Sequence, residues 1–228
     1  MEIKQFLSKP RQTPFAVEWS YVLGEDIIEN INYSQIASVI LSKEKEIISK
    51  YPSSSYSKGG LGEDSLSSRF KHFNVFAWED PEIIKLKKEV LEKYTDFLDK
   101  FKLQRRKVWI QCWANVLRNN QAIDPHIHSI TPFGYLVGHV CIQCEDTSTV
   151  YINPVDQIDN PEKFDSPNAV GKFTIFQSCI PHYTTVHTGK NERITLAFDL
   201  IVDEQLPHLT EDVKSNLVLF DNIKEHDE

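Results

Sequence analysis

Hydrophobic and polar residues alternate along much of the C-terminal half of the chain, in the pattern of half-buried β-strands. Between Val108 and Val116 every second residue is small or apolar, and the intervening positions carry tryptophan and amide side chains. Because successive side chains of a strand point to opposite faces, one face of this strand is predicted to lie in the core. The other face suits either a ligand pocket or a solvated surface. Further strands are predicted at residues 133–144, 148–153, 172–177, 183–187 and 193–202.

About seven or eight short antiparallel strands separated by turns favour a jelly roll, the double-sheet architecture of cupin-like proteins. The N-terminal half differs, since its apolar residues recur mainly at helical spacing. The predicted fold class is therefore mainly β with flanking helices (α+β): a double-stranded β-helix core with an N-terminal helical layer.

Two helices are predicted in the N-terminal half. The first begins at Ser34 and ends before Pro52. The second begins at Asp80-Pro81, because aspartate is a favoured N-cap and proline a favoured first helical residue. An extended segment at 69–76 is predicted to join the sheet. The apolar stripe of the second helix is predicted to comprise Ile84, Leu91, Phe97, Leu98 and Phe101.

A chain of 228 residues is expected to form a single domain with three parts. Residues 1–107 form a helical N-terminal part, residues 108–203 the jelly-roll catalytic core, and residues 204–228 a C-terminal tail. Residues 52–68 are rich in serine and glycine and are predicted to form a loop. This loop is either a surface linker or a lid over the active site, with Gly59-Gly60 as a plausible hinge.

Composition narrows the classes of partner. The chain has 25 basic and 33 acidic residues, a net charge of −8, which argues against nucleic acid as a partner. The N-terminus lacks the pattern of an export signal, and no apolar run is long enough to span a membrane. Four cysteines are too few for a disulfide framework in a chain of this size, so a cytoplasmic location is expected. The exposed sheet edges of a jelly roll could pair two copies as a homodimer.

The segment Asp124-Pro-His-Ile-His128 carries the most informative motif. In an extended segment His126 and His128 project to the same side, close enough to bind one metal ion. A third ligand has to come from elsewhere in the fold. His182 is the candidate, because the strands between it and His128 can return the chain to the same place.

The strand that begins at Arg193 follows the same face-by-face pattern as the strand from Val108. Its core face carries Ile194, Leu196 and Phe198, and its other face carries Arg193, Thr195 and Ala197. A basic and a hydroxyl side chain therefore share a face with a small residue that leaves room for a ligand.

Four elements in this order resemble the 2-oxoglutarate- and Fe(II)-dependent oxygenase superfamily, specifically the prolyl-hydroxylase-like oxygenases of marine bacteria and their viruses. The elements are Trp113-Ala-Asn115, His126-Ile-His128, Phe176-Gln-Ser-Cys-Ile-Pro-His182 and Arg193-Ile-Thr195. The resemblance spans roughly residues 108–203. It implies oxidative decarboxylation of 2-oxoglutarate to succinate and CO2, coupled to hydroxylation of a small-molecule or peptidyl substrate.

The resemblance also implies a role for each residue of these motifs. His126, His128 and His182 would bind Fe(II), leaving metal positions open for the cosubstrate and oxygen. Arg193 would pair with the distal carboxylate of 2-oxoglutarate, because a guanidinium stays charged and binds a carboxylate through two hydrogen bonds. The other expected pocket residues are Thr195, Asn115 and Tyr135 at the cosubstrate and Trp113 at the substrate.

One position departs from the common pattern of the superfamily, in which the second ligand is aspartate or glutamate. Here that position is His128. Either three histidines bind the metal, or Asp124 supplies the carboxylate, since residues 124, 126 and 128 share one face of an extended segment. If the histidines bind alone, Asp124 could accept a hydrogen bond from one of their imidazoles.

Two other functions fit the same histidines. A cupin-type enzyme with three histidine ligands would oxidise a small substrate without 2-oxoglutarate, and a non-catalytic jelly-roll module would use the histidines only for packing. Arg193 separates these alternatives, because a buried guanidinium requires an anionic partner.

Overall fold

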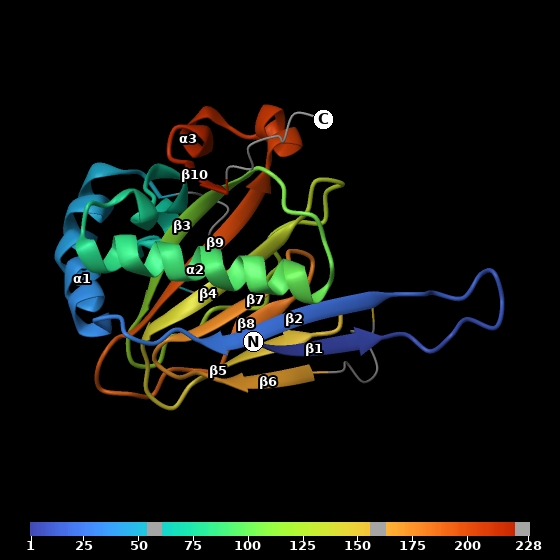
Figure 1. Ribbon diagram of the computed structural model, residues 1–228. Coiled ribbons are helices and arrows are strands. Elements are labelled where there is room, and N and C mark those ends of the chain that lie inside the picture. The colour runs from blue at the N-terminus through green and yellow to red at the C-terminus, as the bar shows by residue number, and fades with distance from the viewer. Residues whose placement is uncertain (54–60, 156–162, 222–228) are drawn as a thin grey trace.

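The computed structural model describes residues 1–53, 61–155 and 163–221, which form two antiparallel β-sheets and flanking helices (Figure 1). The larger sheet has seven strands in the order β1-β2-β7-β4-β9-β3-β10. These strands are β1 (Glu2–Leu7), β2 (Ser20–Ile27), β3 (Val108–Leu117), β4 (Leu136–Gln143), β7 (Lys172–Gln177), β9 (Arg193–Val202) and β10 (Val218–Asp221). The smaller sheet has the order β6-β5-β8, with β5 (Ser148–Ile152), β6 (Lys163–Pro167) and β8 (His182–Thr184).

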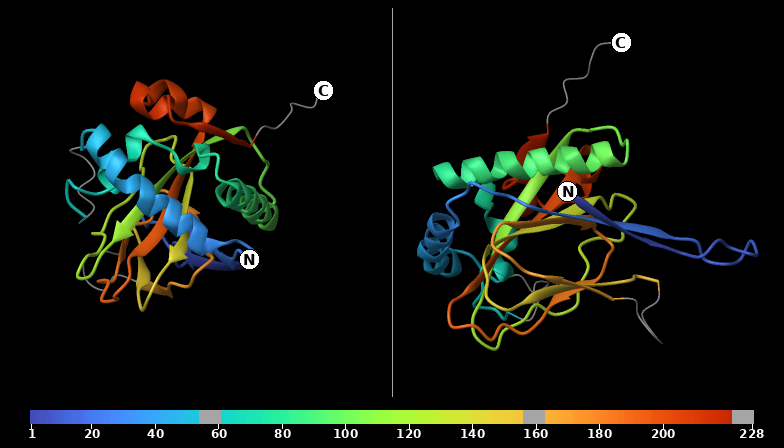
Figure 2. Two further views of the ribbon diagram at one scale, coloured as in Figure 1. Left: turned by 90° about the vertical axis from the view of Figure 1, so that its left-hand side faces the viewer. Right: turned by 60° about the horizontal axis from the view of Figure 1, so that its bottom comes forward.

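The helices and the small sheet lie on opposite faces of the large sheet. Helix α2 (Pro81–Lys100) crosses one face, with α1 (Tyr33–Lys50) beside it, and the small sheet faces the other (Figure 2). The predicted fold class is confirmed: a double-stranded β-helix core with N-terminal helices. None of the helices in the described ranges combines the length and hydropathy needed to cross a membrane.

Strands β3 and β9 form the centre of the large sheet and pair along their whole length, from Val108 opposite Val202 to Leu117 opposite Arg193. The predicted core faces of both strands are buried against the helices. Apolar residues of α1 and α2 belong to the same core cluster. The opposite faces of the same strands look toward the small sheet. This arrangement leaves room for a site between the two sheets.

Helix α2 begins as predicted, and its buried stripe includes the predicted Phe97 and Leu98 but not Ile84. The Asp80 carboxylate accepts hydrogen bonds from the backbone N–H groups of Glu82 and Ile83. Ile84, predicted to be buried, is 39% exposed. The stripe starts one residue earlier and follows a step of three or four residues, which is the spacing of one helix face. Its buried members are Ile83, Leu86, Val90, Tyr94, Phe97 and Leu98.

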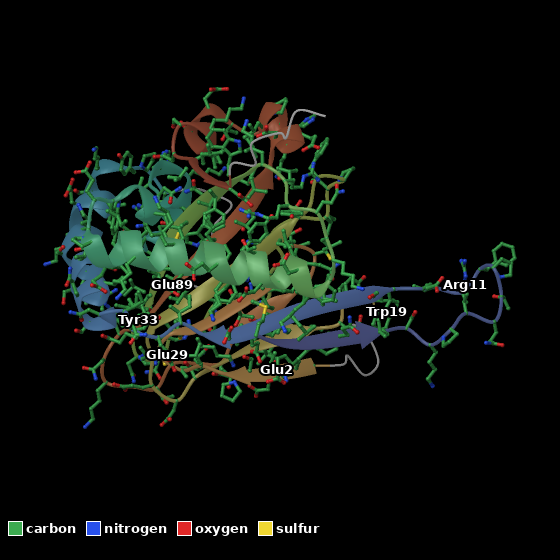
Figure 3. The ribbon with its side chains drawn as sticks, in the orientation of Figure 1. Glu2, Arg11, Trp19, Glu29, Tyr33 and Glu89 are labelled. Atoms are coloured by element: carbon green, nitrogen blue, oxygen red, sulfur yellow. The ribbon has the colours of Figure 1, made fainter. Side chains whose placement is uncertain are left out.

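The prediction that residues 1–107 are helical with one extended piece is wrong at the N-terminus, where β1 and β2 form a hairpin. Figure 3 places Arg11 and Trp19 on the loop of this hairpin, which projects from the body of the molecule. Strand β1 lies at the sheet edge with few buried residues, so its sequence carries little alternation. In β2, a Cβ on Gly24 would come within 2.8 Å of Phe97, so this residue has to be glycine for α2 to lie on the strand.

The prediction of an extended segment at residues 69–76 is also wrong. It forms two short 3-10 helices, η1 (Ser67–His72) and η2 (Val75–Ala77). Side chains, rather than a neighbouring strand, satisfy backbone groups there: Gln111 donates to the carbonyls of Phe70 and Phe73, and Asn74 accepts from the N–H of Phe76. The predicted hinge, Gly59-Gly60, lies outside the described residues. The end of the 52–68 segment is described and reaches the site presented below.

The C-terminal tail adds η3 (Asp203–His208), the short helix α3 (Glu211–Lys214) and the edge strand β10. Strand β10 pairs with β3, and the Asp221 carboxylate forms an ion pair with Arg105 at 2.6 Å. Only a C-terminal tail was predicted at residues 204–228, so the sheet strand within it was not expected. A four-residue strand is too short to show a periodic pattern in the sequence.

Candidate metal centre and its cavities

Two separate segments position the three predicted histidines. His126 and His128 lie in the connection between β3 and β4, and His182 begins β8. The backbones of His126 and His182 exchange two hydrogen bonds, N–H to carbonyl at 3.1 and 3.0 Å. This isolated antiparallel bridge brings the two chain segments together between the sheets.

The three imidazoles form one cluster. One potential ligand atom from each of His126, His128 and His182 lies within 4.8 Å of the other two. The ring centroids are 4.3 Å apart for His126 and His182, and 5.2 Å apart for His128 and His182. Three convergent imidazoles with no carboxylate between them form the type of donor set that binds a divalent transition metal.

Hydrogen bonds fix the orientation of two of these rings. The Nδ1 atom of His126 lies 2.8 Å from the backbone carbonyl of Asp124, and that of His182 lies 3.0 Å from the carbonyl of Ile180. A carbonyl oxygen can only accept, so both Nδ1 atoms carry the proton. The Nε2 atom of each ring therefore keeps its lone pair for a metal.

His128 has a carboxylate partner instead of a carbonyl. Its Nδ1 atom donates to Oδ1 of Asp199 at 2.5 Å, and the side chain of Asp199 is 29% exposed. The sequence analysis missed Asp199. The signal was present, because Asp199 follows Arg193, Thr195 and Ala197 on the same face of β9.

The alternative ligand Asp124 is not part of the histidine cluster. Its side chain is exposed, and its contact with His126 is made by the backbone carbonyl. Of the two ligand sets that the sequence allowed, the geometry favours three histidines. The carboxylate that accepts an imidazole N–H comes from Asp199.

Burial favours the neutral form of the His126 and His182 imidazoles. It lowers the pKa of His182 well below the ordinary value, and the neighbouring His126 and His128 lower it further. The pKa of His126 is lowered as well, first by burial and then by His128. Neutral imidazole is the form that binds a metal, so these rings are ready to act as ligands at neutral pH.

The histidines line a cavity of about 450 Å³ between the two sheets. Four of the five other residues predicted for the pocket also line it: Trp113, Asn115, Arg193 and Thr195. Ser67 and Leu61, from the end of the 52–68 segment, reach the same cavity, and the Ser67 hydroxyl donates to Oδ1 of Asn115.

Tyr135, the fifth predicted residue, does not line this cavity. It lines a second cavity of about 270 Å³ on the other side of His128. Its hydroxyl lies 3.0 Å from that of Tyr94 on α2. The predicted strand at 133–144 included Tyr135, but β4 begins at Leu136, so strand alternation does not fix the direction of this side chain.

Arg193 is the most deeply buried charged residue at the site, with 1% of its surface exposed. Its Nε donates to the Thr147 hydroxyl at 3.2 Å, whereas its Nη1 has no partner within the described part of the chain. Burial lowers the pKa of the guanidinium, which nevertheless remains charged at neutral pH. A cation so placed calls for an anionic ligand in the cavity.

His139, predicted to be structural, also lines this cavity. Its Nε2 lies 2.8 Å from the Tyr151 hydroxyl, and its Nδ1 is buried without a partner among the described residues. Burial, together with the nearby charge of Arg193, lowers the pKa of His139 to about 3. Apart from the ligand nitrogens of the histidine cluster, Arg193 and His139 each bring to this cavity a buried nitrogen that has no partner among the described residues.

The low pKa of His139 predicts an acid-sensitive fold. In the unfolded chain a histidine takes up a proton near pH 6.5, whereas folded His139 stays neutral down to about pH 3. Between these values the unfolded state binds more protons, so stability falls as pH falls, by about 1.4 kcal/mol per pH unit for this group. Urea unfolding of the metal-free protein measures the free energy of unfolding at pH 6.5 and at pH 5. Between these two pH values, wild type is expected to lose about 2 kcal/mol more of this free energy than His139→Gln. The control His208→Gln, at an exposed position, should keep the wild-type loss; equal losses in all three proteins would contradict this assignment.

The part of the chain that carries the histidine cluster and Arg193 is similar to a known protein family. Residues 111–199 match the family model described as "Putative 2OG-Fe(II) oxygenase". The match includes the three histidines and Arg193, and it confirms the enzyme class expected from the sequence. Fe(II) and 2-oxoglutarate are the metal and cosubstrate of that family, as predicted. No curated protein matches the chain.

Solved structures agree on the fold. The viral collagen prolyl hydroxylase of Paramecium Bursaria Chlorella virus-1, in complex with 2OG, is 11% identical with a TM-score of 0.51, covering 79% of this chain and 96% of the other. The non-heme alpha ketoglutarate dependent carbocyclase SnoK from nogalamycin biosynthesis is 10% identical with a TM-score of 0.50, covering 90% and 89%. At these identities the likeness establishes the double-stranded β-helix architecture and nothing finer.

Proposed function

We propose that this protein is an Fe(II)- and 2-oxoglutarate-dependent dioxygenase that hydroxylates a small-molecule or peptidyl substrate. The balanced reaction consumes 2-oxoglutarate, O2 and a C–H bond and yields succinate, CO2 and the corresponding C–OH. The observation that carries this proposal is that three convergent histidines and a buried, incompletely paired Arg193 line a single cavity.

The donor set suits the metal. Nδ1 of His126 and of His182 is engaged by a carbonyl and Nδ1 of His128 by the Asp199 carboxylate, so all three rings would ligate through Nε2. Bound Fe(II) and 2-oxoglutarate would together supply the activation of O2. Three protein ligands leave enough metal positions for that chemistry.

Arg193 would hold the distal carboxylate of the cosubstrate. Its unpartnered Nη1 would donate to one carboxylate oxygen, and a charge-assisted hydrogen bond in a buried cavity is stronger than one in water. His139 lines the same cavity with an unpartnered Nδ1. Thr195 is 2% exposed and adds a hydroxyl beside them.

The aromatic walls would keep water from the reacting groups. Trp113 lies 5.8 Å from His128, and Phe176 lies 4.8 Å from His182, measured between ring centroids. Apolar walls exclude competing solvent and fix the direction from which a substrate can approach. Leu61 and Ser67, from the described end of the 52–68 segment, line the same cavity and would add to this enclosure.

An anaerobic titration tests the proposal. Adding Fe(II) and then 2-oxoglutarate to the purified protein should produce a visible metal-to-ligand charge-transfer band, which should be absent in His182→Ala. His208→Gln is the matched control and should retain the band, because His208 lies outside the histidine cluster. Iron binding without a band would favour the cupin-type enzyme with three histidine ligands, and no iron binding would refute both enzymes in favour of a binding module.

A further inference from the structure

The second cavity adjoins the metal centre. It has a volume of about 270 Å³ and shares His128, Asp199 and Phe70 with the cavity that holds Arg193. Arg193 and Asp199 lie on one face of β9, so the two cavities follow each other along this strand. A molecule in the second cavity would therefore meet the metal centre from the side opposite Arg193.

Two hydrogen-bond acceptors lie next to each other in this cavity. Gln111 on β3 is paired in register with Asp199 on β9, and both residues line the cavity. Side chains directly opposite each other on neighbouring antiparallel strands lie on the same face, with Cβ atoms about 5 Å apart. The amide oxygen of Gln111 and the carboxylate of Asp199 thus form an acceptor pair beside His128.

The amide of Gln111 has a fixed orientation. Its Nε2 donates to the carbonyls of Phe70 and Phe73 at 2.6 and 2.7 Å. A flipped amide would turn its oxygen toward these two carbonyl oxygens, which cannot donate. The Oε1 atom is consequently held away from them, and it is buried with no partner among the residues that the structure describes.

A buried acceptor without a donor is costly, so its presence in a cavity indicates a ligand that supplies the donor. Gln111 is 1% exposed, whereas Asp199 gives Oδ1 to His128 and is partly open to the cavity. Lys71 also lines the cavity, and its positive charge disfavours a cationic ligand there. These features together favour a neutral N–H donor.

We propose that the second cavity binds the substrate of the oxygenase through an amide N–H group, which donates to Gln111 Oε1 and the Asp199 carboxylate. The proposal rests on the function proposed above, because the cavity is assigned to the substrate by its contact with His128. The substrate class is accordingly one that bears a carboxamide or a peptide group.

Three small probes of similar shape test the class of ligand on the full chain. Butyramide carries the N–H group, 2-pentanone replaces the amide nitrogen by carbon, and n-butylammonium carries a charged donor. Calorimetry with wild type should give a dissociation constant for butyramide about tenfold lower than for 2-pentanone. Equal affinities would overturn the proposal, and preference for n-butylammonium would assign the cavity to a cation and overturn the amide class.

Two variants test whether Gln111 causes the preference for butyramide over 2-pentanone. Gln111→Leu should remove the preference for butyramide over 2-pentanone. The control Thr174→Val removes a buried hydroxyl on a strand of the same sheet, but Thr174 lines neither cavity, so the preference should persist. A preference retained by folded Gln111→Leu would contradict the proposal. Because this variant also leaves two carbonyls without donors, its thermal transition is measured first, and the comparison of probes on wild type decides the matter if it does not fold.

Binding is measured on the metal-free protein and again with Fe(II) and 2-oxoglutarate under anaerobic conditions. Amide preference without any iron or 2-oxoglutarate binding would refute the proposed function but leave the cavity as an amide site. A charge-transfer band without amide preference would refute the amide site but leave the proposed function. The two failures are thereby distinguishable.

Discussion

Replacing Arg193 with methionine is expected to weaken 2-oxoglutarate binding by about 100- to 5,000-fold while leaving Fe(II) binding nearly unchanged. The expected size reflects the 3–5 kcal/mol, roughly, that is lost when one partner of a buried charge pair is removed. Fe(II) binding should persist because Arg193 contacts none of the three histidines through a hydrogen bond in the described structure, its bond being to Thr147. Separate titrations with Fe(II) alone and with 2-oxoglutarate on the iron-loaded protein measure the two affinities.

The same substitution should raise the stability of the protein without ligands. Wild-type Arg193 is a buried cation with an unpartnered Nη1, and methionine fills a similar volume without a charge. The thermal midpoint of the ligand-free variant is therefore expected to exceed that of wild type, and the rise caused by 2-oxoglutarate in wild type should disappear.

Arg118→Met is the matched control for Arg193→Met. Arg118, whose side chain is 49% exposed, forms an ion pair with the buried Glu44 at 2.6 Å, and neither residue lines either cavity. Its replacement should leave 2-oxoglutarate affinity unchanged. Equal loss of Fe(II) and 2-oxoglutarate in Arg193→Met would show that Arg193 supports the whole site rather than the cosubstrate.

The strands that form the site were the most predictable part of the fold. Alternation along β3 and β9 is a local property of the sequence, and it placed Trp113, Asn115, Arg193 and Thr195 on the face that lines the cavity. The proximity of His126 and His128 followed from their spacing in an extended segment. The contribution of His182 needed the return of the chain across the two sheets, which the predicted jelly roll allowed and the resemblance to a known family supported.

The misplaced parts share a physical cause: tertiary partners determine them. The β1–β2 hairpin is held by pairing with β7. The η1 and η2 segment is held by Gln111, which is distant in sequence, and by the bond from Asn74 to the distant carbonyl of Ile110. Asp199 was missed because it contacts His128 from another strand, whereas the local Asp124 offered the simpler explanation. The sequence order of acidic residues does not reveal which carboxylate faces an imidazole.

The pairing of His128 with Asp199 would explain why a histidine stands at the position proposed for the second metal ligand. In the common pattern of the resembling superfamily this position is a carboxylate, which lowers the net charge of the iron site. Here the negative charge is supplied one step further away, through the hydrogen bond from His128 Nδ1 to Asp199. A carboxylate at both positions would bring two negative charges close together, which disfavours the ionised form of each.

His128→Asp is therefore expected to lower Fe(II) affinity by more than about 100-fold, and Asp199→Asn alone by about 10- to 100-fold. The double variant carries one carboxylate at these positions instead of two, so the repulsion is absent. Its Fe(II) affinity should recover toward that of wild type and be higher than the affinity expected if the two single losses multiplied. Anaerobic Fe(II) titrations of the four proteins measure this coupling, and Asp124→Asn is the control, because its carboxylate lies outside the histidine cluster. If the two single losses simply multiply, Asp199 does not act through residue 128, and the carboxylate has to be assigned to the substrate cavity alone.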